Sequence, residues 1–199
     1  MPAQVSARKK PGDEITKFTV VYKDVYSWSY FYKLMHEWLL ENGYCSPDDQ
    51  DFKEILYEHI DRPFGAEIWL RWRLEKSETG PYKELFKYFL DINFHILGQK
   101  EVEVVSGGKK YKADKGELEV EAIAYLAQDP DKKVENHWLG KHFQDFVFKV
   151  FLKKKVKQHK KQLAYDMQRL NEAIKNYLKL EAYLPERELS EFYQKRDQS

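Results

Sequence analysis

Three polar residues, Asp91, Asn93 and His95, occupy alternate positions in the run from Phe86 to Leu97. Side chains of a strand alternate between its two faces, so these three would project from the same side. A carboxylate, an amide and an imidazole on one face suit acid–base chemistry or the binding of an anion. Neither a nucleophile nor a glycine-rich phosphate loop accompanies them in the sequence, which weakens the catalytic interpretation.

The apolar members of the same run decide which side is buried. Turning the polar residues inward would expose six large apolar groups, at about 1.5–3 kcal/mol each. The run from Glu67 to Lys76 alternates in the same way and places Trp69, Arg71 and Arg73 on its outward side. We therefore expect an outer sheet face that makes surface contacts and carries no catalysis. Its members are Trp69, Arg71, Arg73, Asp91, Asn93 and His95.

A lysine run near the C-terminus is the one strong local excess of charge. Lysine-rich helices bind phosphates, but the arginines that favour base recognition are not interleaved with these lysines. We expect at most weak contact with polyanions that does not depend on base sequence, and a solvated helix face is the simpler interpretation. The run comprises Lys153, Lys154, Lys155, Lys157, Lys160 and Lys161.

Metal ions and cofactors are not expected. His137 and His142 are five residues apart, so on a helix they point to different sides and lack zinc-binding spacing. The single Cys45 excludes an intrachain disulfide and fits a reducing compartment. We expect an intracellular, cytoplasmic protein, or a part of an assembled particle.

Composition describes a folded chain with a highly charged surface. The 199 residues are 16% aromatic and 34% charged. Lys and Arg total 34 against 33 Asp and Glu, so no global field directs the chain to nucleic acid. No apolar run approaches membrane-spanning length, and we expect no membrane association.

The C-terminal third predicts a long helix over residues 136–180 with two apolar stripes. One globular core cannot easily cover both stripes. Either the helix breaks near Lys153–Lys155 and folds back, or the second stripe binds a partner or a second copy of the chain. The residues that we expect to bind the partner are Phe148, Leu152, Leu163, Met167, Leu170, Ile174 and Tyr177.

The remaining elements predict an α+β fold. A strand at Phe18–Lys23 precedes a helix at Ser27–Asn42, and a hairpin then joins Tyr57–Arg62 to Glu67–Lys76. Further alternating runs complete a curved antiparallel meander, with two helices on one face and the C-terminal one long and partly protruding. This order of elements resembles a helix-grip layout, and we claim no family on that ground.

Four regions follow from this reading. We expect a disordered basic arm at residues 1–14, a body at 15–152, a distal helical extension at 153–184 and a short terminal helix or tail at 185–199. The most economical function is a non-enzymatic interaction or assembly protein that docks through its long C-terminal helix. The first alternative is a protein that associates non-specifically with nucleic acid through the lysine run. The second is a small-ligand binder or enzyme with a site between sheet and helices.

Overall fold

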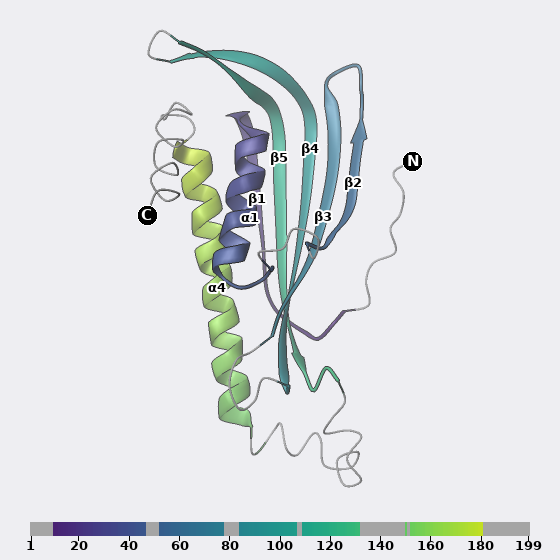
Figure 1. The fold of residues 1–199 in the computed structure, drawn as a ribbon, viewed down its shortest axis with the longest axis vertical. Helices are drawn as coiled ribbons and strands as arrows, with labels where there is room; N and C mark the ends of the chain where they lie inside the picture. The colour runs from purple at the N-terminus through teal and green to yellow at the C-terminus, as the bar shows by residue number, and fades with distance from the viewer. Residues whose placement is uncertain are drawn as a thin grey trace.

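The computed structural model describes residues 10–46, 52–77, 84–106, 109–131, 150 and 152–180. Most of the expected N-terminal arm, Phe148, the first part of the expected long helix and the tail at 185–199 lie outside these residues. In Figure 1 the described residues form a curved sheet, and their helices lie along one of its faces. The predicted α+β class and its layers are confirmed.

The sheet has five antiparallel strands in the order β1-β5-β4-β3-β2. Strands β2 to β5 form a meander, and the first strand pairs with the last one. The strands are β1 (Asp13–Tyr26), β2 (Glu54–Ile60), β3 (Ala66–Ser77), β4 (Phe86–Ser106) and β5 (Lys109–Gln128).

Alternation along β3 and β4 produces the sheet side of the core. The predicted inward residues Leu70, Trp72, Phe86 and Ile92 are all fully buried, and β3 pairs with β4 in a register that keeps inward residues opposite one another. The predicted hairpin between β2 and β3 is also present. Its turn is tight because Gly65, with a positive φ of 127°, lies against the backbone of Gly98, where a Cβ would be only 2.6 Å away.

Helix α1 (Trp28–Glu41) is terminated by Gly43, as the sequence predicts, and Asn42 is its C-cap. Gly43 has a φ of 73°, and its N–H donates to the carbonyl of Leu40, while the N–H of Tyr44 donates to the carbonyl of Leu39. This pair of bonds is a Schellman motif. At the other end, the Trp28 N–H donates to the Asp114 carboxylate of β5 at 2.9 Å, so the sheet itself caps the helix.

Helix α4 (Lys153–Leu180) is the longer of the two and lies beside α1 on the same face of the sheet (Figure 1). Residues 153–180, which we expected to form a distal extension, run along the body. Tyr177 of α4 stacks on Tyr30 of α1, with ring centroids 5.6 Å apart, and contacts Phe31 at 5.3 Å. The two helices therefore share one core with the sheet.

Candidate functional site

The inner side of α4 corrects one of our expectations. The sequence suggested that the stripe containing Leu163 and Leu170 was surplus to the core and free to bind a partner. Both side chains are fully buried in the core of their own chain. The same holds, at exposed fractions of at most 9%, for Leu152, Met167, Ile174 and Tyr177. The sheet is wide enough to cover both helices, which periodicity within one helix does not reveal.

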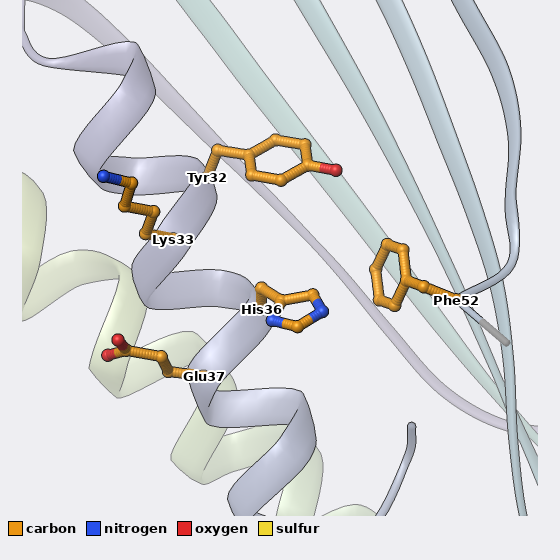
Figure 2. Close-up of a pocket in the computed structure, with 5 residues that line it drawn as sticks. All are labelled: Tyr32, Lys33, His36, Glu37 and Phe52. Carbon is orange, nitrogen blue, oxygen red and sulfur yellow. The ribbon is translucent and has the colours of Figure 1, made fainter. Parts of the chain in front are cut away.

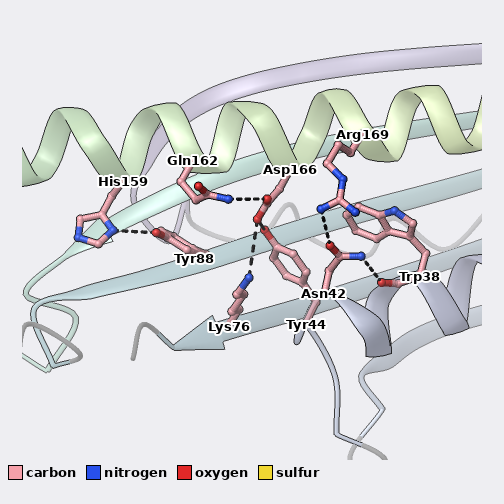
Figure 3. A network of polar contacts seen from close by, with 9 residues as sticks. All are labelled: Trp38, Asn42, Tyr44, Lys76, Tyr88, His159, Gln162, Asp166 and Arg169. Atoms are coloured by element: carbon pink, nitrogen blue, oxygen red, sulfur yellow. Dashed lines mark hydrogen bonds and ion pairs between the residues drawn. The ribbon is translucent and has the colours of Figure 1, made fainter. Parts of the chain in front are cut away.

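Polar contacts fix α4 over the sheet as well. Asp166 is 3% exposed, and its carboxylate accepts a hydrogen bond from the Tyr44 hydroxyl at 3.2 Å and one from Gln162 at 2.9 Å. The Lys76 ammonium lies 3.7 Å from the same carboxylate. Figure 3 shows Asp166 at the centre of these groups, between α4, the end of α1 and β3.

The buried setting of Tyr44 and Asp166 affects the ionisation of the tyrosine. Burial, and then the charge of Asp166, raise the pKa of the Tyr44 hydroxyl far above its ordinary value. A second contact nearer the start of α4 joins Tyr88 and His159, whose hydroxyl oxygen and Nδ1 are 2.7 Å apart (Figure 3). Both residues are buried, so these polar groups hold the helix in position and are not presented to solvent.

The outer side of α4 carries the predicted lysine run. Lys153, Lys154, Lys157 and Lys161 are exposed and make no ion pair with another residue of the described chain. Lys155 and Lys160 are half-buried, and Lys160 pairs with Asp13 at 3.1 Å. Two exposed residues continue the same side toward the C-terminus. We call the set the basic face, and it consists of Lys153, Lys154, Lys157, Lys161, Tyr165 and Arg169.

Sequence reasoning missed Tyr165 and Arg169. The Tyr165 side chain is 57% exposed, and the Arg169 guanidinium carbon lies 5.9 Å from the centre of its ring. The signal was available, because Tyr165 is four residues after Lys161 and Arg169 four after Tyr165, which places all three on one side of a helix. The two residues add an aromatic surface and a guanidinium to the lysines.

The first lysines of the basic face lie at the N-terminal end of α4, where the helix dipole disfavours positive charge. The first turn of α4 contains lysines and no acidic residue. The unpaired N–H groups at a helix N-terminus carry partial positive charge, so cations there are unfavourable by about 0.3–1 kcal/mol each. The lysines and the helix dipole therefore add to one another and make this end of α4 attractive to anions.

The residues that we assigned to the outer sheet face alternate with the buried core residues of β3 and β4 and interact with one another across strands. Asp91 lies 3.3 Å from the Nε of Arg73, and Asn93 donates to Glu121 at 2.7 Å. Burial opposes the ionisation of Glu121, but hydrogen bonds from Lys17 and Asn93 outweigh it and lower the pKa of this carboxyl. Asp91 itself is 5% exposed, so it is more buried than a surface residue.

His95 belongs to a separate cluster on this face. Its ring stacks on Trp69 with centroids 3.7 Å apart, and its Nε2 lies 3.3 Å from Glu67, which also accepts a hydrogen bond from Trp69. Asp91 and His95 therefore have different partners and do not meet in one pocket. The side chain of Arg71, which lies opposite Asn93 on β3, makes no ion pair or hydrogen bond with another residue of the described chain.

Two surface pockets flank α1 and β3. The first has a volume of about 300 Å³ and is lined by Tyr32, Lys33, His36, Glu37 and Phe52 (Figure 2). In Figure 2, His36 points toward Phe52, and the two ring centroids are 4.7 Å apart. The Tyr32 hydroxyl is already engaged, because it donates to Glu54 at 2.9 Å.

The second pocket, of about 430 Å³, lies near the C-terminal end of α1 and includes Lys53, Glu75 and Lys76. The charged groups of this pocket already form ion pairs with other residues of the chain. Lys53 and Lys87 both pair with Glu75, at 2.7 and 3.1 Å, and hydrogen bonds from these lysines lower the pKa of that carboxyl. Neither pocket has the convergent unpaired polar groups that mark a strong ligand site.

The described residues show neither a metal-binding cluster nor a membrane-spanning helix. These contain no group of three or more His, Cys, Asp or Glu side chains arranged to hold a metal ion. No helix in the same residues is long and apolar enough to cross a membrane.

The chain matches no protein-family model, and no curated protein or solved structure is significantly similar to it. Among the surfaces described, the basic face combines exposure, charge and the fewest internal partners.

Proposed function

We propose that this protein binds nucleic acid through the phosphate backbone, using the basic face of α4 and without recognising base sequence. The observation that carries the proposal is a row of exposed lysines that make no ion pair with a carboxylate of the described residues. From Lys153 to Asn171 the only acidic residue is Asp166, and it is turned into the core. This stretch rises about 27 Å along the helix axis, long enough to follow several phosphates.

The charge of the whole chain supports this assignment by contrast. The formal net charge is only +1, so the positive potential of the basic face is a local feature of α4. Several lysines of the sheet instead pair with carboxylates, as in Lys23–Glu117 and Lys112–Glu101. Lysines that only keep a protein soluble need no such segregation from acids.

The burial of the inner side of α4 separates this proposal from membrane binding. An amphipathic helix binds a lipid surface by inserting its apolar side between headgroups. The apolar side of α4, including Leu163 and Leu170, is fully buried against its own sheet. The outer side of α4 presents charge to a partner, and charge suits the sugar–phosphate backbone of a nucleic acid.

The test is binding of a labelled oligonucleotide by fluorescence anisotropy over a range of salt concentrations. The substitutions Lys154→Gln, Lys157→Gln and Lys161→Gln together should weaken binding. They should also reduce the slope of log affinity against log salt by about 2 to 3, since each lost phosphate contact contributes about 0.7–0.9.

The matched control makes the same change in charge on other surfaces, at Lys33, Lys100 and Lys115, which are exposed and make no ion pair within the described chain. This control should retain the affinity and salt slope of the wild type. Equal losses in the two triple variants, or binding that does not depend on salt, would overturn the proposal. Tighter binding to anionic phospholipid vesicles than to the oligonucleotide would also overturn it.

A further inference from the structure

We propose that the basic face is selective for single-stranded nucleic acid, because one unpaired base stacks on Tyr165. This inference rests on the proposed function and adds the class of nucleic acid that the site accepts. Base–aromatic stacking is how proteins bind single strands without reading sequence, since every base has a π-face. In a duplex the bases are paired and stacked on one another. The duplex would therefore contact the lysines through its phosphates and would offer no free base to Tyr165.

The exposure of Tyr165 is the first observation behind this proposal. Large apolar or aromatic side chains on the outer side of a helix gain nothing from the core, and α4 otherwise presents Lys, Gln, Arg and other polar groups there. Tyr165 is 57% exposed, while Tyr177, the other tyrosine of α4, is 6% exposed. Helix α4 therefore keeps one of its two tyrosine rings in solvent, between Lys161 and Arg169 of the basic face.

The second observation is that Tyr165 has a positioned neighbour. Arg169 lies over its ring, with 5.9 Å between the guanidinium carbon and the ring centroid. The guanidinium also donates to the side-chain oxygen of Asn42 at 3.3 Å, and Asn42 in turn donates to the carbonyl of Trp38 at 2.8 Å. Figure 3 shows this chain of contacts running from α4 to the end of α1.

The result of these contacts is a guanidinium tethered to the body of the protein beside an exposed ring. A tether of this kind reduces the side-chain entropy that Arg169 would lose on binding. Planar guanidinium and phenol groups are both surfaces on which bases stack, and arginine adds a cation–π contribution.

Spacing along α4 fits an extended single strand. Lys154, Lys157, Lys161 and Tyr165 follow one another at intervals of three or four residues, about one helical turn each. From Lys154 to Tyr165 the axis rises about 16 Å. A strand lying along the helix would contact the lysines through its phosphates and turn one base onto Tyr165.

The experiment compares three labelled ligands in the full chain: a dT12 single strand, a 12-base-pair duplex and inorganic polyphosphate, which has charge but no bases. Tyr165→Ala should weaken binding of the single strand about tenfold, a value within the range for loss of one stacked base. The same variant should bind polyphosphate and the duplex as the wild type does. Tyr165→Phe, which keeps the ring, should retain wild-type affinity for the single strand.

Tyr57→Ala is the matched control, because Tyr57 is 53% exposed on β2 and is not part of the basic face. It should leave all three affinities unchanged. A direct readout is photocrosslinking of a 5-iodouracil oligonucleotide followed by mass spectrometry, in which the crosslinked peptide should contain Tyr165.

The outcomes separate the two proposals. If the lysine variants weaken binding but Tyr165→Ala has no effect, or if duplex binds as tightly as single strand, the stacking inference is wrong and the phosphate contact stands. If Tyr165→Ala weakens polyphosphate binding equally, the ring does not act by stacking and the inference is wrong. If the wild type binds none of the three ligands, both proposals fail.

Discussion

The inner and outer sides of α4 belong to the same helix but affect stability in opposite ways. The inner residues stabilise the fold, whereas the lysines at the start of the outer side are unfavourable. On the inner side, Leu163, Leu170 and Ile174 are fully buried, and even the acid Asp166 has hydrogen-bonding partners there. On the outer side, lysines occupy a helix start where positive charge is unfavourable. The comparison teaches that folding accounts for the inner residues and does not account for the outer ones, which is why we assign binding to the outer side.

The largest expected effect comes from placing charges on the inner side. Leu163→Glu together with Leu170→Glu should abolish folding, because each change loses about 2–5 kcal/mol of packing and buries a carboxylate besides. The summed loss of stability from the two substitutions is comparable to the whole net stability of a typical domain, about 5–15 kcal/mol. Circular dichroism and thermal melts would measure the loss.

The control for this pair places the same two charges on the outer side, at Gln158→Glu and Ala164→Glu, which are exposed positions. These should change stability by no more than about 0.5 kcal/mol each. A folded inner-side variant with a near-normal melting temperature would show that α4 does not belong to the core.

A smaller effect is expected from removing the buried acid of the inner side. Asp166→Ala should lower the free energy of unfolding by about 1–3 kcal/mol, because Tyr44 and Gln162 lose their acceptor and Lys76 loses its counter-charge. For a chain of this size that is a fall of about 2–12 °C in the melting temperature. Tyr44→Phe, which removes one hydroxyl, should cost less, and the reverse order would contradict the central place of Asp166.

The same network predicts a loss of stability in alkali. Tyr44 has a raised pKa when folded, so its contribution is complete below its ordinary pKa of 10.0. Above that pH the unfolded chain releases the proton first, and stability falls by at most about 1.4 kcal/mol per pH unit for this group. Urea unfolding between pH 9 and 11 should therefore show a steeper decline for the wild type than for Tyr44→Phe. If stability fell equally steeply with pH in the wild type and in Tyr44→Phe, the pKa of the Tyr44 hydroxyl would not be raised by folding.

The smallest effect has the opposite sign. Lys153→Glu and Lys154→Glu should stabilise the protein by about 0.3–1 kcal/mol each, because they place anions at the start of α4. The same substitutions should weaken oligonucleotide binding. Urea unfolding and anisotropy on the same samples would measure both effects, and a variant that gains stability without losing affinity would separate the basic face from binding.

Sequence alone predicted the sheet well because strand alternation is a local property. The inward residues of β3 and β4, such as Trp72 and Ile92, are buried as their alternation required, and Gly43 ends α1 as expected. The hairpin from β2 to β3 followed from the turn residues between them. Each of these features depends on neighbours within a few residues.

What the sequence did not predict depends on distant segments. Whether Leu163 faces a partner or its own sheet is decided by the width of a sheet whose edge strand β1 lies far away in the chain. Asp166 could not be recognised as buried, because its partner Tyr44 is 122 positions earlier. For Tyr165 the spacing from Lys161 was visible in the sequence, but the exposure of its ring was established only by the structure.

The pairing of β1 with β5 also sets the order in which the chain can mature during synthesis. Asp13 lies opposite Leu126, so 113 residues must follow the start of the first strand before its partner exists. At ribosomal speeds that interval lasts roughly 6 to 23 s. Throughout it, the aromatic side of α1 has no completed sheet to cover it, and α4 is the last of the described elements to be made. We expect nascent chains that stop before β5 to require chaperones, while chains that extend through α4 close the whole core in one late step.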